Sequence, residues 1–273
     1  MFALQPIGVA RTPFSTTRSI PRQGAGPAQI EVFPDFAPAL VGIDQCSHLW
    51  VLAYFDEADR SILQARPRNA PGDAPPHGVF AMRAPVRPNP IGLSAVRLLA
   101  RHNTTLTVDR LDCRDNTPVV DLKPYSPGWD LIPSALSVHR YDPSRYAPDE
   151  IRDALWRDAH NALGLCADQM AVVGELIDAL CQLALDAAID IRDTGTRFAI
   201  DAADARVDVL LCATGASFGN RRLSLMGREP DVVLRVWTRD QRWGVCRPMG
   251  EQAPLSSQLR LREEPASSPS RSG

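Results

Sequence analysis

Apolar and polar residues alternate in short runs through the first half of the chain, and turn residues separate the runs. The runs lie at residues 7–9, 29–33, 48–55, 78–82, 94–99 and 104–108. A period of two places successive side chains on opposite faces of a strand, so each run is expected to be a half-buried β-strand. Because no helical pattern separates the runs, the sequence predicts an all-β sandwich or barrel up to about residue 133.

The pattern changes after Tyr141–Pro148, a linker-like stretch with prolines at 143 and 148. From Asp149 onward it becomes helical, and one apolar helix face is formed by Val172, Val173, Leu176, Ile177, Leu180, Leu183 and Ala184. Short strands are expected again at 197–200, 207–211, 222–225, 232–237 and 243–246. We therefore predict a mainly β N-terminal domain over 1–145, an α+β accessory domain of unknown role over 149–260, and a disordered polar tail over 261–273.

Composition narrows the class of protein only a little. The chain has 273 residues, 44% of them hydrophobic, which is enough for one large or two ordinary domains. Its net charge of −2 provides no global basic field, so any nucleic-acid surface must be local. No apolar run approaches the roughly 20 residues that span a bilayer, and the N-terminus lacks a secretory pattern. We expect a cytoplasmic protein that makes no membrane contact.

The cysteines and histidines do not indicate a metal site. The six cysteines include no C-x-x-C pair, and the five histidines have no ligand-like spacing from them. Most of the cysteines lie in apolar surroundings, which favours buried thiols over a catalytic cysteine. The chain also lacks the G-x-G-x-x-G pattern of dinucleotide-binding folds.

The stretch Arg87-Pro-Asn-Pro-Ile-Gly-Leu-Ser94 interrupts the β pattern in an unusual way. Pro88 and Pro90 fix φ and push the residues before them toward extended geometry, so Arg87 and Asn89 should lie on a stiff connection. Gly92 then permits a close approach or a positive φ. Such a loop suits the binding of a polar small ligand, although a Pro-rich surface turn would have the same composition.

This segment resembles the signature of the TrmO family (TsaA-like or YaeB-like proteins), which are S-adenosylmethionine-dependent tRNA methyltransferases. Four more segments resemble the family in the same order, and the resemblance covers roughly residues 5 to 133. They are Ile7–Phe14, Pro21–Gln23, Gly42–Val51 and Leu111–Tyr125.

The resemblance implies a small β-barrel methyltransferase that binds S-adenosyl-L-methionine as a homodimer, with the cofactor near a subunit boundary. It also implies methylation at N6 of threonylcarbamoyl-adenosine next to the anticodon of tRNA. The positions that match the family's cofactor site are Gln23, Phe55, Asp56, Arg83, Ser94, Asp115, Asn116, Thr117 and Pro118.

We expect Arg87, Asn89 and Lys123 to bind the substrate that accepts the methyl group. The ureido nitrogen is a poor nucleophile until its proton is lost or shared, and Tyr125 and Asp112 are the candidate catalytic residues, with Asp121 as a further choice. His48 is another possible base, but a hydrogen-bonded structural histidine at the start of an apolar strand is the simpler interpretation.

The segment Asp115-Asn-Thr-Pro118 can be a turn that offers backbone N–H groups and a carboxylate to a ribose or adenine edge, or a simple hairpin turn. The family usually has glycine at the position of Asn116, and asparagine is the best substitute at positive φ. Between Ala65 and Pro76 the sequence predicts a long loop, in which Arg66 and Arg68 either reach a phosphate or are merely solvated.

The second half of the chain leaves the methyl acceptor open. Bacterial family members commonly carry an Asp-Pro-Arg-Pro-x-Tyr stretch there, and this chain has none. Three functions therefore stand: a tRNA N6-adenosine methyltransferase, a methyltransferase for a small metabolite selected by the second domain, and a non-catalytic nucleoside-binding protein.

Overall fold

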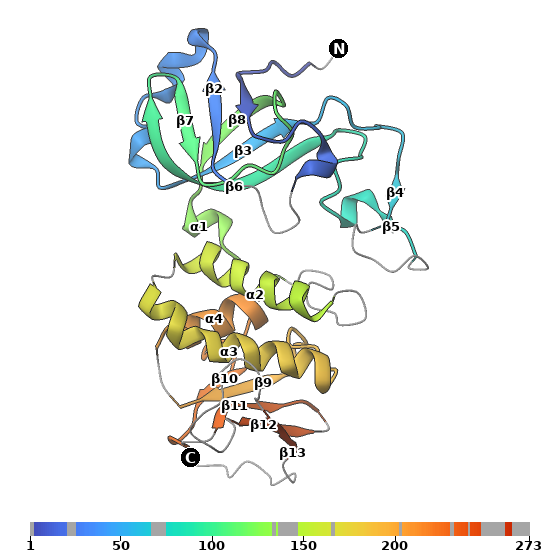
Figure 1. The fold of residues 1–273 in the computed structure, drawn as a ribbon, viewed down its shortest axis with the longest axis vertical. Coiled ribbons are helices and arrows are strands. Elements are labelled where there is room, and N and C mark those ends of the chain that lie inside the picture. The colour runs from blue at the N-terminus through green and yellow to red at the C-terminus, as the bar shows by residue number, and fades with distance from the viewer. Residues whose placement is uncertain are drawn as a thin grey trace. The chain divides into compact units, whose positions relative to one another are not determined.

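The chain divides into two compact units, Met1–Leu131 and Ile132–Gly273. The computed structural model describes residues 3–20, 26–66, 75–132, 135, 147–164, 167–201, 204–229, 232–239, 241–246 and 260–263, and Figure 1 shows the fold. Each unit has its own sheet and its own buried core, so each is considered separately.

The first unit is built on six antiparallel strands that close into a ring (Figure 1). Around the ring the order is β1-β2-β7-β6-β3-β8. The strands are β1 (Gly8–Arg11), β2 (Ala28–Val32), β3 (His48–Tyr54), β6 (Ile91–His102), β7 (Thr105–Val108) and β8 (Pro118–Pro124). The ring closes because β8 pairs with β3 along one edge and with β1 along the other.

Alternation along β3 shows why this sequence forms a ring with a packed interior. Leu49, Val51 and Ala53 are buried, whereas the residues between them are partly exposed. The buried set from all six strands forms one core that also includes Leu40 from the β2–β3 connection. The mainly β character expected for this part of the chain is therefore confirmed, as a six-stranded antiparallel sheet in a ring.

Short elements fill the connections of the first unit. The 3₁₀ turns are η1 (Thr17–Ser19), η2 (Pro34–Leu40), η3 (Ile43–Gln45) and η4 (Val79–Ala81), and α1 (Pro127–Asp130) follows the last strand of the ring. A two-stranded ribbon of β4 (Gln64–Ala65) and β5 (His77–Gly78) flanks the loop predicted from Ala65 to Pro76. Residues 67–74 of that loop, Arg68 among them, lie outside the described residues.

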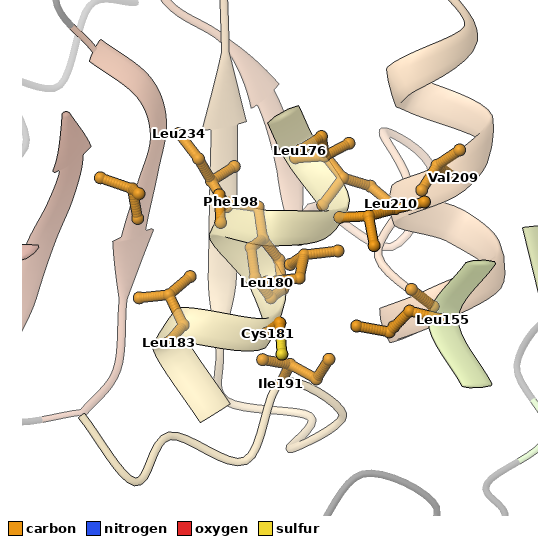
Figure 2. Close-up of a cluster of buried hydrophobic side chains, with 14 of the residues drawn as sticks. Leu155, Leu176, Leu180, Cys181, Leu183, Ile191, Phe198, Val209, Leu210 and Leu234 are labelled. Atoms are coloured by element: carbon orange, nitrogen blue, oxygen red, sulfur yellow. The ribbon is translucent and has the colours of Figure 1, made fainter. Parts of the chain in front are cut away.

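The second unit packs helices on a five-stranded sheet of order β10-β9-β11-β12-β13. The helices are α2 (Pro148–Leu163), α3 (Ala167–Asp186) and α4 (Ala205–Thr214). The strands are β9 (Arg197–Ile200), β10 (Leu223–Leu225), β11 (Val232–Trp237), β12 (Arg242–Cys246) and β13 (Arg260–Glu263). Figure 2 shows Leu180, Phe198 and Leu210 meeting between the sheet and the helices, and these residues belong to a single buried core. The helix expected around 172–184 is confirmed as α3.

Two strand predictions were wrong. Residues 78–82 form the end of β5 and the turn η4. Residues 207–211 lie inside helix α4, because Asp204 caps its first turn by accepting a hydrogen bond from the Arg206 amide and Gly215 ends it at φ 71°. An apolar run as short as 207–211 does not distinguish a strand from a buried helix, and the flanking Asp and Gly were the signal that decided it.

The outer limits of the second unit were only partly predictable. Residues 261–263 were expected to begin a disordered tail, whereas they belong to β13, which pairs with β12. The rest of that tail and residues 141–146 of the predicted linker lie outside the described residues, so the proposed domain limits at 145 and 149 stay predictions. Among the described helices, none combines the length and apolarity needed to cross a bilayer.

We predict that Asp204→Ala destabilises the second unit by about 1 kcal/mol, because it removes the side-chain cap of α4. Asp204→Asn should keep most of the stability, since asparagine caps a helix about as well as aspartate. The urea midpoints of the three proteins measure the effect. An Asp204→Ala midpoint equal to that of the parent chain would show that the cap contributes nothing.

Candidate functional site

A cavity of about 520 Å³ opens in the first unit where three connections of the ring meet. Its walls come from the segment after η1, the turn after β3, the segment before β6 and the turn before β8. Five residues expected from the sequence line it together: Phe55, Asp56, Arg83, Asp112 and Thr117. The other lining residues are Thr17, Ile20, Glu57, Ala58, Asp59, Pro85, Val86, Cys113 and Arg114.

Phe55 is fixed in the wall by its backbone and by Gly92. Its amide donates to the Pro90 carbonyl over 2.8 Å as β3 ends. A Cβ atom at Gly92 would lie 2.3 Å from Cζ of Phe55, so only glycine lets the ring approach the β6 backbone this closely. The close approach expected at Gly92 is therefore confirmed, and its φ is not positive.

Arg87 anchors the proline-rich loop through hydrogen bonds to backbone carbonyls. The Arg87 guanidinium donates through Nη2 to the carbonyls of Val79, at 2.7 Å, and Met82, at 2.5 Å. Arg60 donates to the Pro88 carbonyl at 2.8 Å. Arg87 thus ties the loop to turn η4 and does not line the cavity, and Asn89 is exposed. Their assignment to substrate binding stays a prediction.

The Asp115–Pro118 turn is held within the fold. Asn116 has φ 61°, as expected for asparagine in the position of a glycine. The amides of Asp115 and Asn116 donate to the carbonyls of Phe14 and Ala10, and the Asp115 carboxylate accepts from the Thr12 amide at 3.1 Å. These groups are used inside the fold, so the turn reaches the cavity wall through Thr117, whose hydroxyl donates to the Arg114 carbonyl.

The cavity wall carries four carboxylates and two guanidinium groups beside apolar side chains. Arg114 Nη2 lies 3.2 Å from Asp56 and 3.0 Å from Glu57, so it braces both carboxylates after β3. The hydroxyl and amide of Ser61 donate to Asp59 and lower the pKa of that carboxyl. Arg83 donates to the Leu93 carbonyl. The lining is therefore rich in anionic groups while keeping two cations.

Cys113 lies in the wall but is not suited to act as a nucleophile. Burial raises the pKa of its thiol to about 12, so the group stays protonated near neutral pH. Within the described ranges, no three His, Cys, Asp or Glu side chains are grouped so that they could hold a metal ion. The other ionisable groups of the lining are its four carboxylates and two guanidinium groups.

The remaining predicted residues lie elsewhere. Lys123 pairs with Asp121 at 2.8 Å and lines a second, mostly apolar cavity of about 370 Å³. Tyr125 packs on Trp50, with ring centroids 5.4 Å apart, and its amide donates to His48. Ser94 pairs with Val51 within the ring. Gln23 lies outside the described residues.

Sequence reasoning missed Arg114 and Glu57, which form the ionic cluster of the cavity with Asp56. Both are sequence neighbours of residues that were predicted, Arg114 beside Asp115 and Glu57 beside Asp56. Nothing in their spacing indicates that residues 57 and 114 meet, because the contact depends on how the ring closes.

Comparison with known proteins places this half of the chain in a family. A model of the tRNA-methyltransferase O N-terminal domain matches residues 9–131. An "S-adenosyl-L-methionine-binding protein" of Archaeoglobus fulgidus is 41% identical over 132 residues, which are 47% of this chain and 93% of the relative. A "probable S-adenosyl-L-methionine-binding protein" of the same organism is 44% identical over 135 residues, 48% of this chain and 36% of that relative.

A third relative is named for its reaction. The "tRNA (adenine(37)-N6)-methyltransferase" of Escherichia coli is 35% identical over 150 residues, which are 50% of this chain and 63% of the enzyme. Each of these three matches thus spans about half of this chain, and two of them span less than two thirds of the relative.

We predict that Gly92→Ala lowers the free energy of unfolding by about 1–3 kcal/mol, because the new methyl group displaces the Phe55 ring. Gly78→Ala is the matched control, since nothing lies within 4 Å of a Cβ placed there. It should change stability by less than about 0.5 kcal/mol. Chemical denaturation measures both, and equal midpoints for the two variants would contradict the close approach.

We also predict that Cys113 resists alkylation by iodoacetamide at pH 8 in the folded chain, since its raised pKa leaves almost no thiolate. Peptide mass mapping before and after unfolding in guanidinium chloride measures this. Rapid labelling of Cys113 in the folded chain would show that the thiol is ionised or exposed.

Proposed function

Because this chain belongs to the TrmO family of methyltransferases, we propose that it binds S-adenosylmethionine in the 520 Å³ cavity and transfers the methyl group to tRNA. The observation that carries the proposal is the convergence of five sequence-predicted residues on this one cavity, although they lie up to sixty-two positions apart, from 55 to 117. The volume lies within the roughly 300–1,000 Å³ typical of ligand pockets.

The wall offers a partner for each part of the cofactor. Phe55, Ile20, Pro85 and Val86 form an apolar surface that suits the adenine ring. The carboxylates suit the ribose hydroxyls and the cationic ammonium and sulfonium groups, and a guanidinium group suits the carboxylate of the methionine part. The volume of the cavity and the chemical character of its lining therefore support the proposed cofactor site.

When bound, the cofactor supplies an activated methyl group, so the protein needs to position the acceptor and remove its proton. Asp112 is exposed on the cavity wall, and we assign it the role of base. Arg114 keeps Asp56 and Glu57 in place while the acceptor enters. Tyr125 lies against Trp50 and is not among the lining residues of this cavity.

We propose N6 of threonylcarbamoyl-adenosine beside the anticodon as the methyl acceptor. We propose that Arg87, Asn89 and Lys123 contact this substrate. The reaction named for the Escherichia coli relative supports this choice. A tRNA acceptor also supports a cytoplasmic location.

We further propose that the chain acts as a homodimer. Leu52 and Leu93 lie opposite each other on the outer side of β3 and β6, and Leu93 is 43% exposed. Trp50 and Lys123 occupy the next paired positions along the same outer surface. The apolar side chains on this outer surface favour contact with a second copy, and Tyr125, which packs on Trp50, would then lie at the subunit boundary.

The test is nucleoside mass spectrometry of tRNA incubated with the purified chain and methyl-labelled S-adenosylmethionine. The tRNA comes from cells that make threonylcarbamoyl-adenosine but do not methylate it. We expect label on that nucleoside. Unlabelled tRNA, with cofactor binding shown by calorimetry, would overturn the tRNA assignment in favour of a small-molecule acceptor.

We predict that Asp112→Asn lowers the single-turnover rate of methyl transfer by about 10²-fold or more, because the proton acceptor is lost. Cofactor affinity should fall far less, since asparagine keeps the size of the side chain and one of its two acceptor oxygens. Asp35→Asn, at an exposed position in η2, is the control and should keep full activity. An Asp112→Asn variant with the parent rate would remove Asp112 from the mechanism.

A further inference from the structure

The sheet of the second unit has two different faces. Figure 2 shows Phe198 and Leu234 directed toward the helices, and both belong to the buried core together with Val236. Successive side chains of a strand point to opposite faces. Arg197 and Trp237, the sequence neighbours of Phe198 and Val236, therefore lie on the face opposite the helices.

An aromatic ring lies between two arginines on this second face. In the strand register, Trp237 of β11 is opposite Arg197 of β9 on one side and Arg242 of β12 on the other. The guanidinium carbon of Arg242 is 5.4 Å from the centroid of the Trp237 ring, a cation–π contact. Arg197 is exposed, and Trp237 and Arg242 are partly exposed. We call these three residues the arginine–tryptophan row.

In the neighbouring row of the same face, the charge of one arginine is compensated by an ion pair. Arg235 lies between Ala199 and Gly244 in the register, and it pairs with Glu229 at 2.5 Å. The two small residues add no bulk beside the arginine–tryptophan row, and the ion pair compensates the charge of Arg235. On the same face, β13 adds Arg262 opposite Gly244 and Arg260 opposite Cys246 in the register. The row at residues 197, 237 and 242 is where arginines flank an aromatic ring on this cationic face.

We propose that the arginine–tryptophan row binds unpaired bases of the RNA substrate. The inference rests on the proposed tRNA methyltransferase function and assigns the second unit a part in it. Unpaired RNA bases stack on aromatic rings and on guanidinium planes, and phosphates pair with arginine. The chain carries a net charge of −2, so its RNA affinity must come from a local surface of this kind.

The experiment measures binding of fluorescein-labelled, unmethylated tRNA to the full-length chain by anisotropy over a series of salt concentrations. Trp237→Ala should weaken binding by about tenfold, the loss expected for one stacked base, and Trp237→Phe should restore most of it. Arg197→Ala should lower the magnitude of the logarithmic salt slope by about 0.7, as for the loss of one phosphate contact with a single strand.

Two matched controls change residues that are not part of this face. Trp129→Ala removes an 88% exposed tryptophan from α1 of the first unit. Arg157→Ala removes an arginine from α2, in the helical layer that covers the other face of the sheet. Both should bind tRNA like the parent chain.

Arg197→Glu keeps the test decisive if Trp237→Ala lowers stability, because Arg197 is exposed and its replacement leaves the core intact. Parent-like affinity and salt slope in Arg197→Glu and Arg197→Ala would overturn the proposal. Failure of the proposed function would give a different result, because the parent chain itself would then leave the tRNA without methyl label in the mass-spectrometry assay. If only the role assigned to the arginine–tryptophan row is wrong, the variants bind tRNA with the affinity of the parent chain and still methylate it.

Discussion

The pairing of β8 with both β1 and β3 is the constraint on which the first unit depends. It closes the sheet, and it brings the turn before β8 against the turn that follows β3. Residues 112–114 and 55–59 thereby form adjoining parts of one cavity wall. A sheet left open between β1 and β8 would keep every strand of the sequence pattern but would separate Thr17 and Ile20, in the β1–β2 connection, from the rest of the wall.

Within that frame, two arginines of the signature segments brace the protein. Arg87 donates to carbonyls of Val79 and Met82, and Arg114 joins two carboxylates that follow β3. Guanidinium groups suit this task because each offers several donors in a fixed plane. Arg87 thus ties the proline-rich loop to turn η4, and ion pairs of Arg114 connect two segments of the cavity wall.

The second unit uses a buried arginine in a similar way. Arg222 is 8% exposed and donates to the carbonyls of Thr196, Thr214 and Asp193, which ties the end of α4 to the start of β9. Burial lowers the pKa of Arg222, yet all three contacts are with carbonyl oxygens that stabilise its charge. One face of the sheet packs against the helices, and the arginine–tryptophan row lies on the other face.

The sequence by itself determined the β character of the first half and the helix at α3, because alternation and helical periodicity are properties of neighbouring positions. Through the resemblance of its segments to a family, it also singled out five of the residues that line the cavity. Residues 207–211 are helical because Asp204 and Gly215 cap the segment, a local signal that the strand prediction missed. The tertiary structure alone decided that Arg87 faces backbone carbonyls and that Arg114 meets Glu57, because each contact joins residues from different segments. Strand pairing, which no local pattern encodes, also decided that Trp237 lies between Arg197 and Arg242.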